Sequence, residues 1–439
     1  MILIKAAVIF FASNVFAFVR ILKPPINLSI ILFVFAVLYI IIFNIKPSLK
    51  KYQTIKIQRI KNGVSLLEVF LILIVPDILC LLFLIYGNRI STKDIIINSF
   101  IVILQMFILF WNGIIRTYIF SEQIGIKWRV IGIVCGWIPL VNIIVLIKII
   151  RIAYSEYKTE QEKLELNNFR KQYEICKTKY PILLVHGVFF RDFRFFNYWG
   201  RIPDEIKKNG GEVFYGNQQS AASVEQCGKE IAERIKDIVK ENKCGKVNII
   251  AHSKGGLDSR YAISFFGADK YVASLTTINT PHRGCQFADY LLDIAPIRLK
   301  NSVADKYNKI LKKLGDNDPD FLSAVKDLTA ENCIKRNEVC KNSEKVYYQS
   351  IGSKSIKASG SRFPLNLSYH LVKYFDGDND GLVSVNSMKW GESFKLFQPE
   401  KKRGISHGDM IDLNRENIDG FDVREAYVNI VSGLKEMGF

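Results

Sequence analysis

One serine stands where a strand pattern changes into a helix pattern. The segment reads Val247-Asn-Ile-Ile-Ala-His-Ser253-Lys-Gly-Gly256, and a helical pattern continues through residues 257–265. A serine hydroxyl becomes a nucleophile only when it is exposed, held rigidly and placed beside a base. A tight strand-turn-helix connection meets the first two conditions, provided that small residues flank the turn. Ser253 is therefore the candidate nucleophile, and a turn serine without chemistry is the alternative.

The base has to come from five histidines. His252 adjoins the nucleophile and is expected to face away from it, while His186 and His282 lie in turn-like His-Gly and Pro-His-Arg-Gly segments. The turn resembles that of the α/β-hydrolases, in which the nucleophile is followed along the chain first by the acid and then by the histidine. His407 alone follows a suitable acidic loop, so we predict it as the general base. A buried structural histidine is the alternative.

The acid is expected in the segment that runs from residue 375 to 384 and reads Phe-Asp-Gly-Asp-Asn-Asp-Gly-Leu-Val-Ser. We choose Asp380, because an ionised carboxylate there would hold the imidazole tautomer and stabilise the imidazolium. Asp376 and Asp378 compete for this role. The segment also matches the first half of a calcium loop, but Ser387 stands where a bidentate glutamate is needed. A partial calcium role for Asp376 or Asp378 stays open.

The developing oxyanion needs two backbone N–H donors, one after the nucleophile and one after the first core strand. Lys254 supplies the first. His186-Gly-Val188 ends an apolar strand pattern at residues 182–185, which makes Val188 the candidate for the second.

Strand and helix patterns alternate from residue 180 onward. A helix pattern covers residues 224–239, and strand patterns cover residues 182–185, 213–215, 247–250, 273–278 and 346–351. This alternation predicts an α/β domain with a mainly parallel sheet.

Four separated motifs resemble the bacterial true lipases, which are triacylglycerol lipases of the α/β-hydrolase fold. The motifs are Val185-His-Gly-Val188, Ala251-His-Ser-Lys-Gly-Gly256, Thr280-Pro-His-Arg-Gly284 with Phe287-Ala-Asp289, and Asn379-Asp-Gly-Leu-Val-Ser384. Their order and spacing agree as well, and the resemblance covers about residues 180–435. It implies a Ser253, His407 and Asp380 triad, with the amides of Val188 and Lys254 as the oxyanion hole. The implied reaction is hydrolysis of lipid carboxylic esters, first of all triacylglycerols, through an acyl-enzyme.

The same resemblance bears on metals and disulfides. Many members bind a structural calcium through an aspartate two residues after the catalytic histidine, which would be Asp409. The upstream aspartate is replaced by the segment Lys357-Ala-Ser-Gly, and Asn386 stands in place of the family's disulfide cysteine. The resemblance thus implies no required cofactor and leaves calcium at Asp409 as an option. Cys333 and Cys340 either pair locally or are buried free thiols.

Residues 1–153 read as a transmembrane region of about five helices. The apolar runs fall near residues 3–22, 26–45, 64–87, 95–120 and 129–150, each long enough to span ~30 Å of hydrocarbon. Residues 46–61 hold six basic and no acidic side chains, which places this loop in the cytoplasm. Alternation of five spans then predicts a multi-pass protein of the cell membrane with its catalytic domain on the extracellular side. The first run is alternatively a signal segment.

Most of the excess positive charge lies in this region. Residues 1–154 hold 16 Lys and Arg against 4 Asp and Glu, which is +12 of the chain's +18. The chain has neither an RNA-stacking motif nor a zinc-finger spacing. We therefore expect a membrane with anionic headgroups as the partner, and no nucleic acid.

The rest of the chain divides into a polar helical connector at residues 154–179 and a lipase-like domain at residues 180–439. Near residues 290–315, apolar side chains recur at helical intervals opposite five lysines, which indicates a basic amphipathic segment. The resemblance to lipases implies that this region is a lid that opens at lipid surfaces. An ordinary surface helix explains the spacing equally well.

Two further readings of the function stay open. A phospholipase, thioesterase or lipid acyltransferase would use the same site, because fold and triad do not select the acyl donor. A non-catalytic membrane sensor that retains the fold would explain why there are more spans than tethering needs. The oligomeric state is not predicted.

Overall fold

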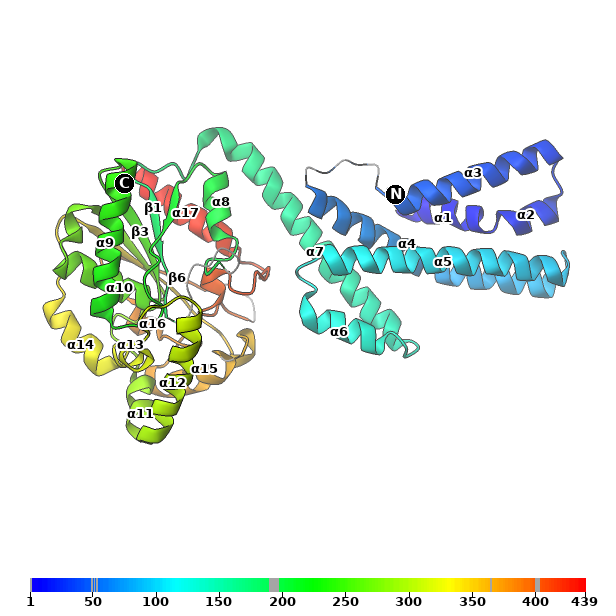
Figure 1. The fold of residues 1–439 in the computed structure, drawn as a ribbon. Coiled ribbons are helices and arrows are strands. Elements are labelled where there is room, and N and C mark those ends of the chain that lie inside the picture. The colour runs from blue at the N-terminus through cyan, green and yellow to red at the C-terminus, as the bar shows by residue number, and fades with distance from the viewer. Residues whose placement is uncertain are drawn as a thin grey trace. The chain divides into compact units, whose positions relative to one another are not determined.

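The computed structural model describes residues 2–48, 50, 52, 54–188, 197–363, 365–398 and 403–439. The chain forms two compact units, Met1–Leu166 (unit 1) and Asn167–Phe439 (unit 2), both visible in Figure 1. The division falls inside the stretch predicted as a polar connector.

Unit 2 is built on a six-stranded sheet in the order β2-β1-β3-β4-β5-β6, and every neighbouring pair is parallel. The predicted α/β class with a parallel sheet is confirmed, and β6 is a strand that the sequence pattern did not reveal. The strands are β1 (Ile182–Val185), β2 (Val213–Tyr215), β3 (Val247–His252), β4 (Val272–Ile278), β5 (Tyr347–Ser353) and β6 (Ser393–Phe397).

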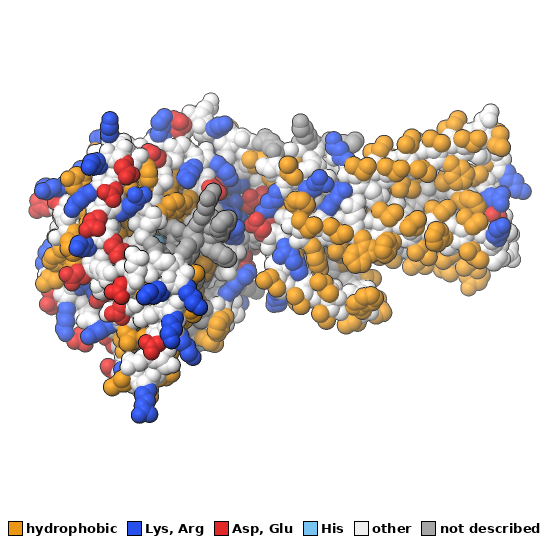
Figure 2. All heavy atoms as spheres, viewed as in Figure 1, with side chains coloured by type: hydrophobic (Ala, Val, Ile, Leu, Met, Phe, Trp, Pro, Cys, Tyr) orange, Lys and Arg blue, Asp and Glu red, His pale blue; other side chains and the backbone are white. Residues whose placement is uncertain are grey.

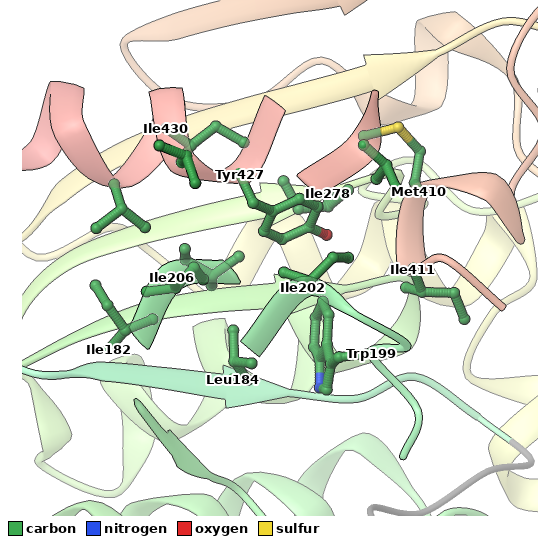
Figure 3. Close-up of a cluster of buried hydrophobic side chains, with 14 of the residues drawn as sticks. Ile182, Leu184, Trp199, Ile202, Ile206, Ile278, Met410, Ile411, Tyr427 and Ile430 are labelled. Atoms are coloured by element: carbon green, nitrogen blue, oxygen red, sulfur yellow. The ribbon is translucent and has the colours of Figure 1, made fainter. Parts of the chain in front are cut away.

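Helices cover both faces of this sheet, so its central strands are buried on both sides and read as continuous apolar runs. Leu184 points to a cluster with α8 (Ile202–Lys208) and α17 (Val423–Glu436), part of which is drawn in Figure 3. Its neighbour Leu183 points to the opposite cluster, with α9 (Val224–Asn242) and α10 (Lys254–Phe265). Successive residues of a strand therefore pack into two different hydrophobic cores, one on each face of the sheet.

The connection from β4 to β5 is long and helical. It holds α11 (Gln286–Ile294), α12 (Ile297–Lys313), α13 (Phe321–Lys326) and α14 (Ala330–Val339). Two more helices, α15 (Leu365–Asp376) and α16 (Val385–Met388), follow between β5 and β6. These helices lie near the carboxyl ends of the strands, where parallel sheets place their sites.

Unit 1 is entirely helical in its described part. Its elements are α1 (Ile2–Ser13), α2 (Val15–Leu22), α3 (Ile26–Ile45), α4 (Ile55–Gly87), α5 (Thr92–Phe120), α6 (Gly125–Cys135) and the first part of α7 (Val141–Arg170). Apolar side chains cover much of the visible face of this unit, as Figure 2 shows. Within the described residues, α3, α4 and α5 are long and apolar enough to cross a membrane, and the bent pair α1 and α2 makes a fourth candidate.

The prediction of five spans is therefore wrong in its last member. Residues 129–150 do not form one helix, because α6 ends at Cys135 and α7 begins only at Val141. Pro139 lacks a backbone N–H and disfavours helical geometry at the residue before it, and Leu140 adopts a left-handed φ of 66°. The apolar run is continuous in sequence but broken in structure.

All eight cysteines are free. Cys333 and Cys340 are both buried, so the structure agrees with the alternative of buried thiols and not with a local disulfide.

Candidate active site

Ser253 lies at the turn between β3 and α10, with φ 54° and ψ −130°. This backbone conformation is rare for a residue with a Cβ atom, and it marks a strained turn. The Ser253 N–H donates to the Ile278 carbonyl oxygen of the neighbouring strand at 2.9 Å. A Cβ at Gly255 would lie 2.3 Å from the His186 carbonyl oxygen, and one at Gly256 would lie 2.2 Å from the Thr280 hydroxyl. The two glycines after Ser253 are thus required by close packing of the turn.

Asp380 and His407 form a direct pair. The His407 Nδ1 lies 2.7 Å from the Asp380 Oδ2, and the His407 N–H donates to the Asp380 carbonyl oxygen at 2.9 Å. The carboxylate is fully buried and accepts three further hydrogen bonds, from the Asn279 amide at 2.6 Å and from the N–H groups of Leu382 and Val383 at 2.9 and 2.7 Å. These hydrogen bonds hold the carboxylate in a fixed orientation beside the His407 ring.

The two competing aspartates have other partners. Asp378 forms an ion pair with Lys354, and Asp376 accepts a hydrogen bond from the Gln286 N–H. Of the three candidates for the acid, the structure brings Asp380 alone into contact with His407.

His407 also lies against the residue that precedes Ser253. The ring centroids of His252 and His407 are 4.5 Å apart. Among the described residues, no hydrogen bond joins the Ser253 hydroxyl to His407. Such bonds are often long without substrate and tighten in the Michaelis complex, so the arrangement is compatible with base catalysis.

His252 packs into the site and does not face away from it, contrary to the expectation from its position. Its Nδ1 is hydrogen-bonded to the Tyr198 hydroxyl at 2.7 Å, and burial lowers the pKa of its imidazole well below the usual value. A neutral ring is therefore packed against His407. The sequence did not reveal this contact, since it joins residues that are distant along the chain.

Asn279 is a second residue that the sequence reasoning missed. It follows β4 directly, adopts a φ of 47° and donates to the buried carboxylate of Asp380. A polar residue immediately after a buried parallel strand was a usable signal, because such residues gather at one edge of the sheet.

The two candidate oxyanion donors flank the turn. Lys254 is the first residue of α10, so its N–H has no partner within the helix. Val188 follows Gly187, where an added Cβ would lie 2.9 Å from the Ser253 Cβ. The backbone before Val188 therefore runs directly beside the nucleophile, and residues 189–196 lie outside the described residues.

The Lys254 side chain turns inward. Its ammonium group donates to Asp258 one helical turn later at 2.7 Å, and both side chains are buried. This ion pair fixes the first turn of α10, which carries the Lys254 N–H.

The remaining histidines lie elsewhere. His186 is buried, with its ring nitrogens near the carbonyl oxygens of Gly187 and Gln218. His282 is buried between Thr277 and Arg260 and stacks on Trp390, whereas His370 is exposed. Each of the three therefore has surroundings other than the Asp380–His407 pair.

The surroundings of Asp409 do not fit calcium. Its carboxylate accepts from the Ser406 N–H and hydroxyl and from the Arg403 guanidinium at 3.1 Å, so a cationic side chain already neutralises it. The described residues contain no group of three or more His, Cys, Asp or Glu side chains that could hold a metal ion. We derive no catalytic step through calcium.

The predicted lid region forms α11 and α12. Leu311 of α12 belongs to the same buried cluster as Val188, while Ile297, Leu299 and Ile310 are exposed. One face of α12 thus packs beside a candidate oxyanion residue, and apolar side chains elsewhere on the helix face solvent.

Comparisons with known proteins agree with this geometry. Residues 213–314 match a family model described as "Putative serine esterase (DUF676)". Triacylglycerol lipase 2 of Saccharomyces cerevisiae is 32% identical over 262 residues, which cover 55% of this chain and 74% of the yeast protein. The chain belongs to the triacylglycerol lipase family. The residues that match the esterase model, 213–314, include strands β2, β3 and β4 and Ser253.

Two bacterial triacylglycerol lipases align over a shorter region of 173 residues. The triacylglycerol lipase of Pseudarthrobacter phenanthrenivorans is 34% identical over 173 residues, covering 36% of this chain and 53% of that protein. The chain thus spans about half the length of this relative, and 48% of a similar lipase from Burkholderia plantarii. Among solved structures, the Staphylococcus hyicus lipase is similar with a TM-score of 0.48 and 18% identity, covering 60% of this chain and 97% of the lipase.

Proposed function

We propose that unit 2 hydrolyses carboxylic esters of lipids, with Ser253 as nucleophile, His407 as general base and Asp380 as the acid that orients it. The observation that carries this proposal is the buried Asp380–His407 pair beside the strained turn of Ser253. The His407 Nδ1 and the Asp380 Oδ2 are 2.7 Å apart. A buried carboxylate that three other donors hold in place orients the imidazole as base catalysis requires.

The reaction follows from these positions. The Ser253 Oγ attacks the acyl carbonyl carbon while the His407 Nε2 takes its proton, and the N–H groups of Lys254 and Val188 stabilise the tetrahedral oxyanion. His407 then gives that proton to the departing alcohol, which leaves an acyl-serine. A water molecule, deprotonated by His407, cleaves the acyl-serine and restores the hydroxyl. Asp380 orients the imidazole and stabilises the imidazolium.

Triacylglycerols are the substrate class that family membership favours, since relatives carry that name. Unit 1 supports a membrane setting, because its apolar helices would hold unit 2 at a source of lipid esters. We place the lid at α12, whose exposed apolar side chains would contact lipid and whose Leu311 would shield Val188. The exposed lysines of α12 would favour anionic surfaces.

The test measures fatty acid released by the full-length protein in mixed micelles of triacylglycerol, of phospholipid or of an acyl thioester. We expect release from triacylglycerol, and its loss in Ser253→Ala. Ser264→Ala, on the same helix, is the matched control and should retain the activity.

Faster release from phospholipid or thioester would replace the proposed substrate class but keep the mechanism. Acyl transfer to an added alcohol without release would identify an acyltransferase. If none of these esters is cleaved by folded protein, the non-catalytic sensor becomes the better account.

A further inference from the structure

The segment between α5 and the polar part of α7 has its two ends next to each other. The carboxylate of Glu156 accepts from the Ser121 hydroxyl at 2.6 Å and from the N–H groups of Glu122 and Gln123 at 3.2 and 3.1 Å. A segment that crossed the membrane would separate its ends by ~30 Å. Here the two ends are held together by hydrogen bonds to one buried side chain.

The length of α6 agrees with a turn inside the membrane. Its 11 residues reach about 16 Å at 1.5 Å per residue, roughly half of the hydrocarbon thickness. The chain then reverses at residues 136–140 and returns along α7. We call residues 122–156 the α6–α7 hairpin.

Most of the exposed side chains between residues 126 and 144 are apolar, while Lys127, Lys148 and Arg151 are exposed basic side chains of the same hairpin. Trp137 is 88% exposed and Ile126 is 79% exposed, and further exposed side chains are Val130, Ile133, Val134, Leu140 and Ile144. On the inner side, Val145 and Ile149 pack against Ile60 and Val64 of α4. The hairpin is thus anchored to a candidate span, and its exposed face continues the apolar surface of that span. Acyl chains are the partner that such a face fits.

The end at which the hairpin closes is also the end where α4 begins. The hydroxyl groups of Tyr157 and Tyr52 are 3.3 Å apart, the Lys56 ammonium lies 3.3 Å from Glu156, and the Lys61 ammonium lies 5.0 Å from the Tyr154 ring centre. The polar part of α7 therefore leaves unit 1 beside the basic loop that links α3 and α4.

Basic side chains are concentrated at this end. The basic side chains described there include Lys5, Lys46, Lys50, Lys56, Arg59, Lys61, Arg116, Lys127 and Arg129. The opposite ends of the helices have four, namely Arg20, Lys23, Arg89 and Lys93, and Arg20 is paired with Asp94. Such an excess of Lys and Arg marks the cytoplasmic side of a membrane protein.

We propose that the α6–α7 hairpin is a re-entrant element that enters the lipid leaflet on the basic side and returns, so that unit 2 follows on the cytoplasmic side. This replaces the extracellular placement predicted from five alternating spans, whose last step required residues 129–150 to cross. The inference rests on the proposed membrane attachment. It assigns the esters of the inner leaflet to this enzyme as substrates.

Two insertion variants of the full-length protein test the proposal. One has a site for a specific protease and an epitope tag inserted after Asn88, in the turn between α4 and α5; the other has the same insertion after Phe439. Protease is added outside intact spheroplasts and, separately, after their permeabilisation. We expect external cleavage at residue 88 and protection at the C-terminus until the cells are permeabilised.

A fifth segment that crossed the membrane would give a different pattern of protease cleavage, because residue 88 and the C-terminus would then lie on the same side of the membrane. External cleavage of both variants would therefore overturn the re-entrant hairpin, and protection of the Asn88 site with exposure of the C-terminus would overturn the cytoplasmic placement. Release of the protein into the soluble fraction would instead reject the membrane attachment. Lipase activity of the tagged proteins, measured in detergent, reports on the proposed function independently.

Discussion

The two units place their apolar residues in opposite ways. In unit 2, every residue of β3 and β4 is buried between two layers of helices. In unit 1, apolar side chains such as Ile26 and Tyr86 are 76% and 81% exposed, while Asn14 and Asn98 are buried and hydrogen-bonded to each other. An apolar run therefore indicates only that water is excluded. Whether protein or lipid excludes the water is decided by the other residues of the unit.

The largest effect is expected from a substitution that abolishes catalysis by unit 2 and leaves unit 1 unchanged. Asp380→Asn should lower kcat for a soluble ester about 10⁴-fold, because the amide no longer stabilises the imidazolium. Asp376→Asn, at the end of α15 four residues earlier, is the matched control and should retain activity. Equal losses in both variants would contradict the assignment of Asp380. Membrane attachment should be unchanged in each.

A smaller effect is expected from crowding the nucleophile. In Gly187→Ala the new methyl group would lie 2.9 Å from the Ser253 Cβ and 2.8 Å from the Tyr198 hydroxyl. The displaced serine should lower kcat about 10²-fold while the protein remains folded. Gly433→Ala in α17, where nothing lies within 4 Å, should leave kcat unchanged. Full activity of Gly187→Ala would show that the loop before Val188 does not form the site.

Unit 1 should respond to the loss of Glu156 without any change in the chemistry. Glu156→Ala leaves the Ser121 hydroxyl and two N–H groups without their acceptor, which should lower the stability of the hairpin by about 2 kcal/mol. Thermal aggregation in detergent measures this change, with exposed Glu162→Ala as the control. A loss of kcat in the folded variant at 25 °C would show that the units are functionally coupled.

Acidification should destabilise unit 2 through its buried histidines. Burial lowers the pKa of His252 and of His282 well below the ordinary value, so the folded state keeps both rings neutral. The unfolded chain binds these protons near pH 6.5, and stability is therefore lost as the pH falls below that value, by about 1.4 kcal/mol per pH unit for each ring. Unfolding midpoints between pH 5 and 7.5 should be less pH-dependent in His252→Gln than in His370→Gln. Identical slopes would contradict this account.

The sequence predicted most of unit 2 because its signals are local. Ser253 lies in a turn that needs small neighbours, and the order of acid and histidine along the chain points to Asp380 and His407. The packing of His252 on His407 is a tertiary contact that leaves no local signal, so the sequence could not predict it, whereas the position of Asn279 directly after a buried strand was a usable signal. The prediction for unit 1 was wrong at one point. Hydrophobicity gives the length of an apolar run, but it does not show whether the run forms one continuous helix. Gly136 and Pro139 inside residues 129–150 were the available warning.

The central claim is that Ser253 is an activated nucleophile in the membrane-attached protein. The direct measurement is reaction of membranes that contain the full-length chain with a fluorophosphonate probe, followed by mass spectrometry of the modified peptides. We predict an adduct on Ser253 in the wild-type protein and its loss in His407→Ala, because the hydroxyl then has no base. An unmodified Ser253 in folded protein, or equal labelling in the absence of His407, would contradict the account.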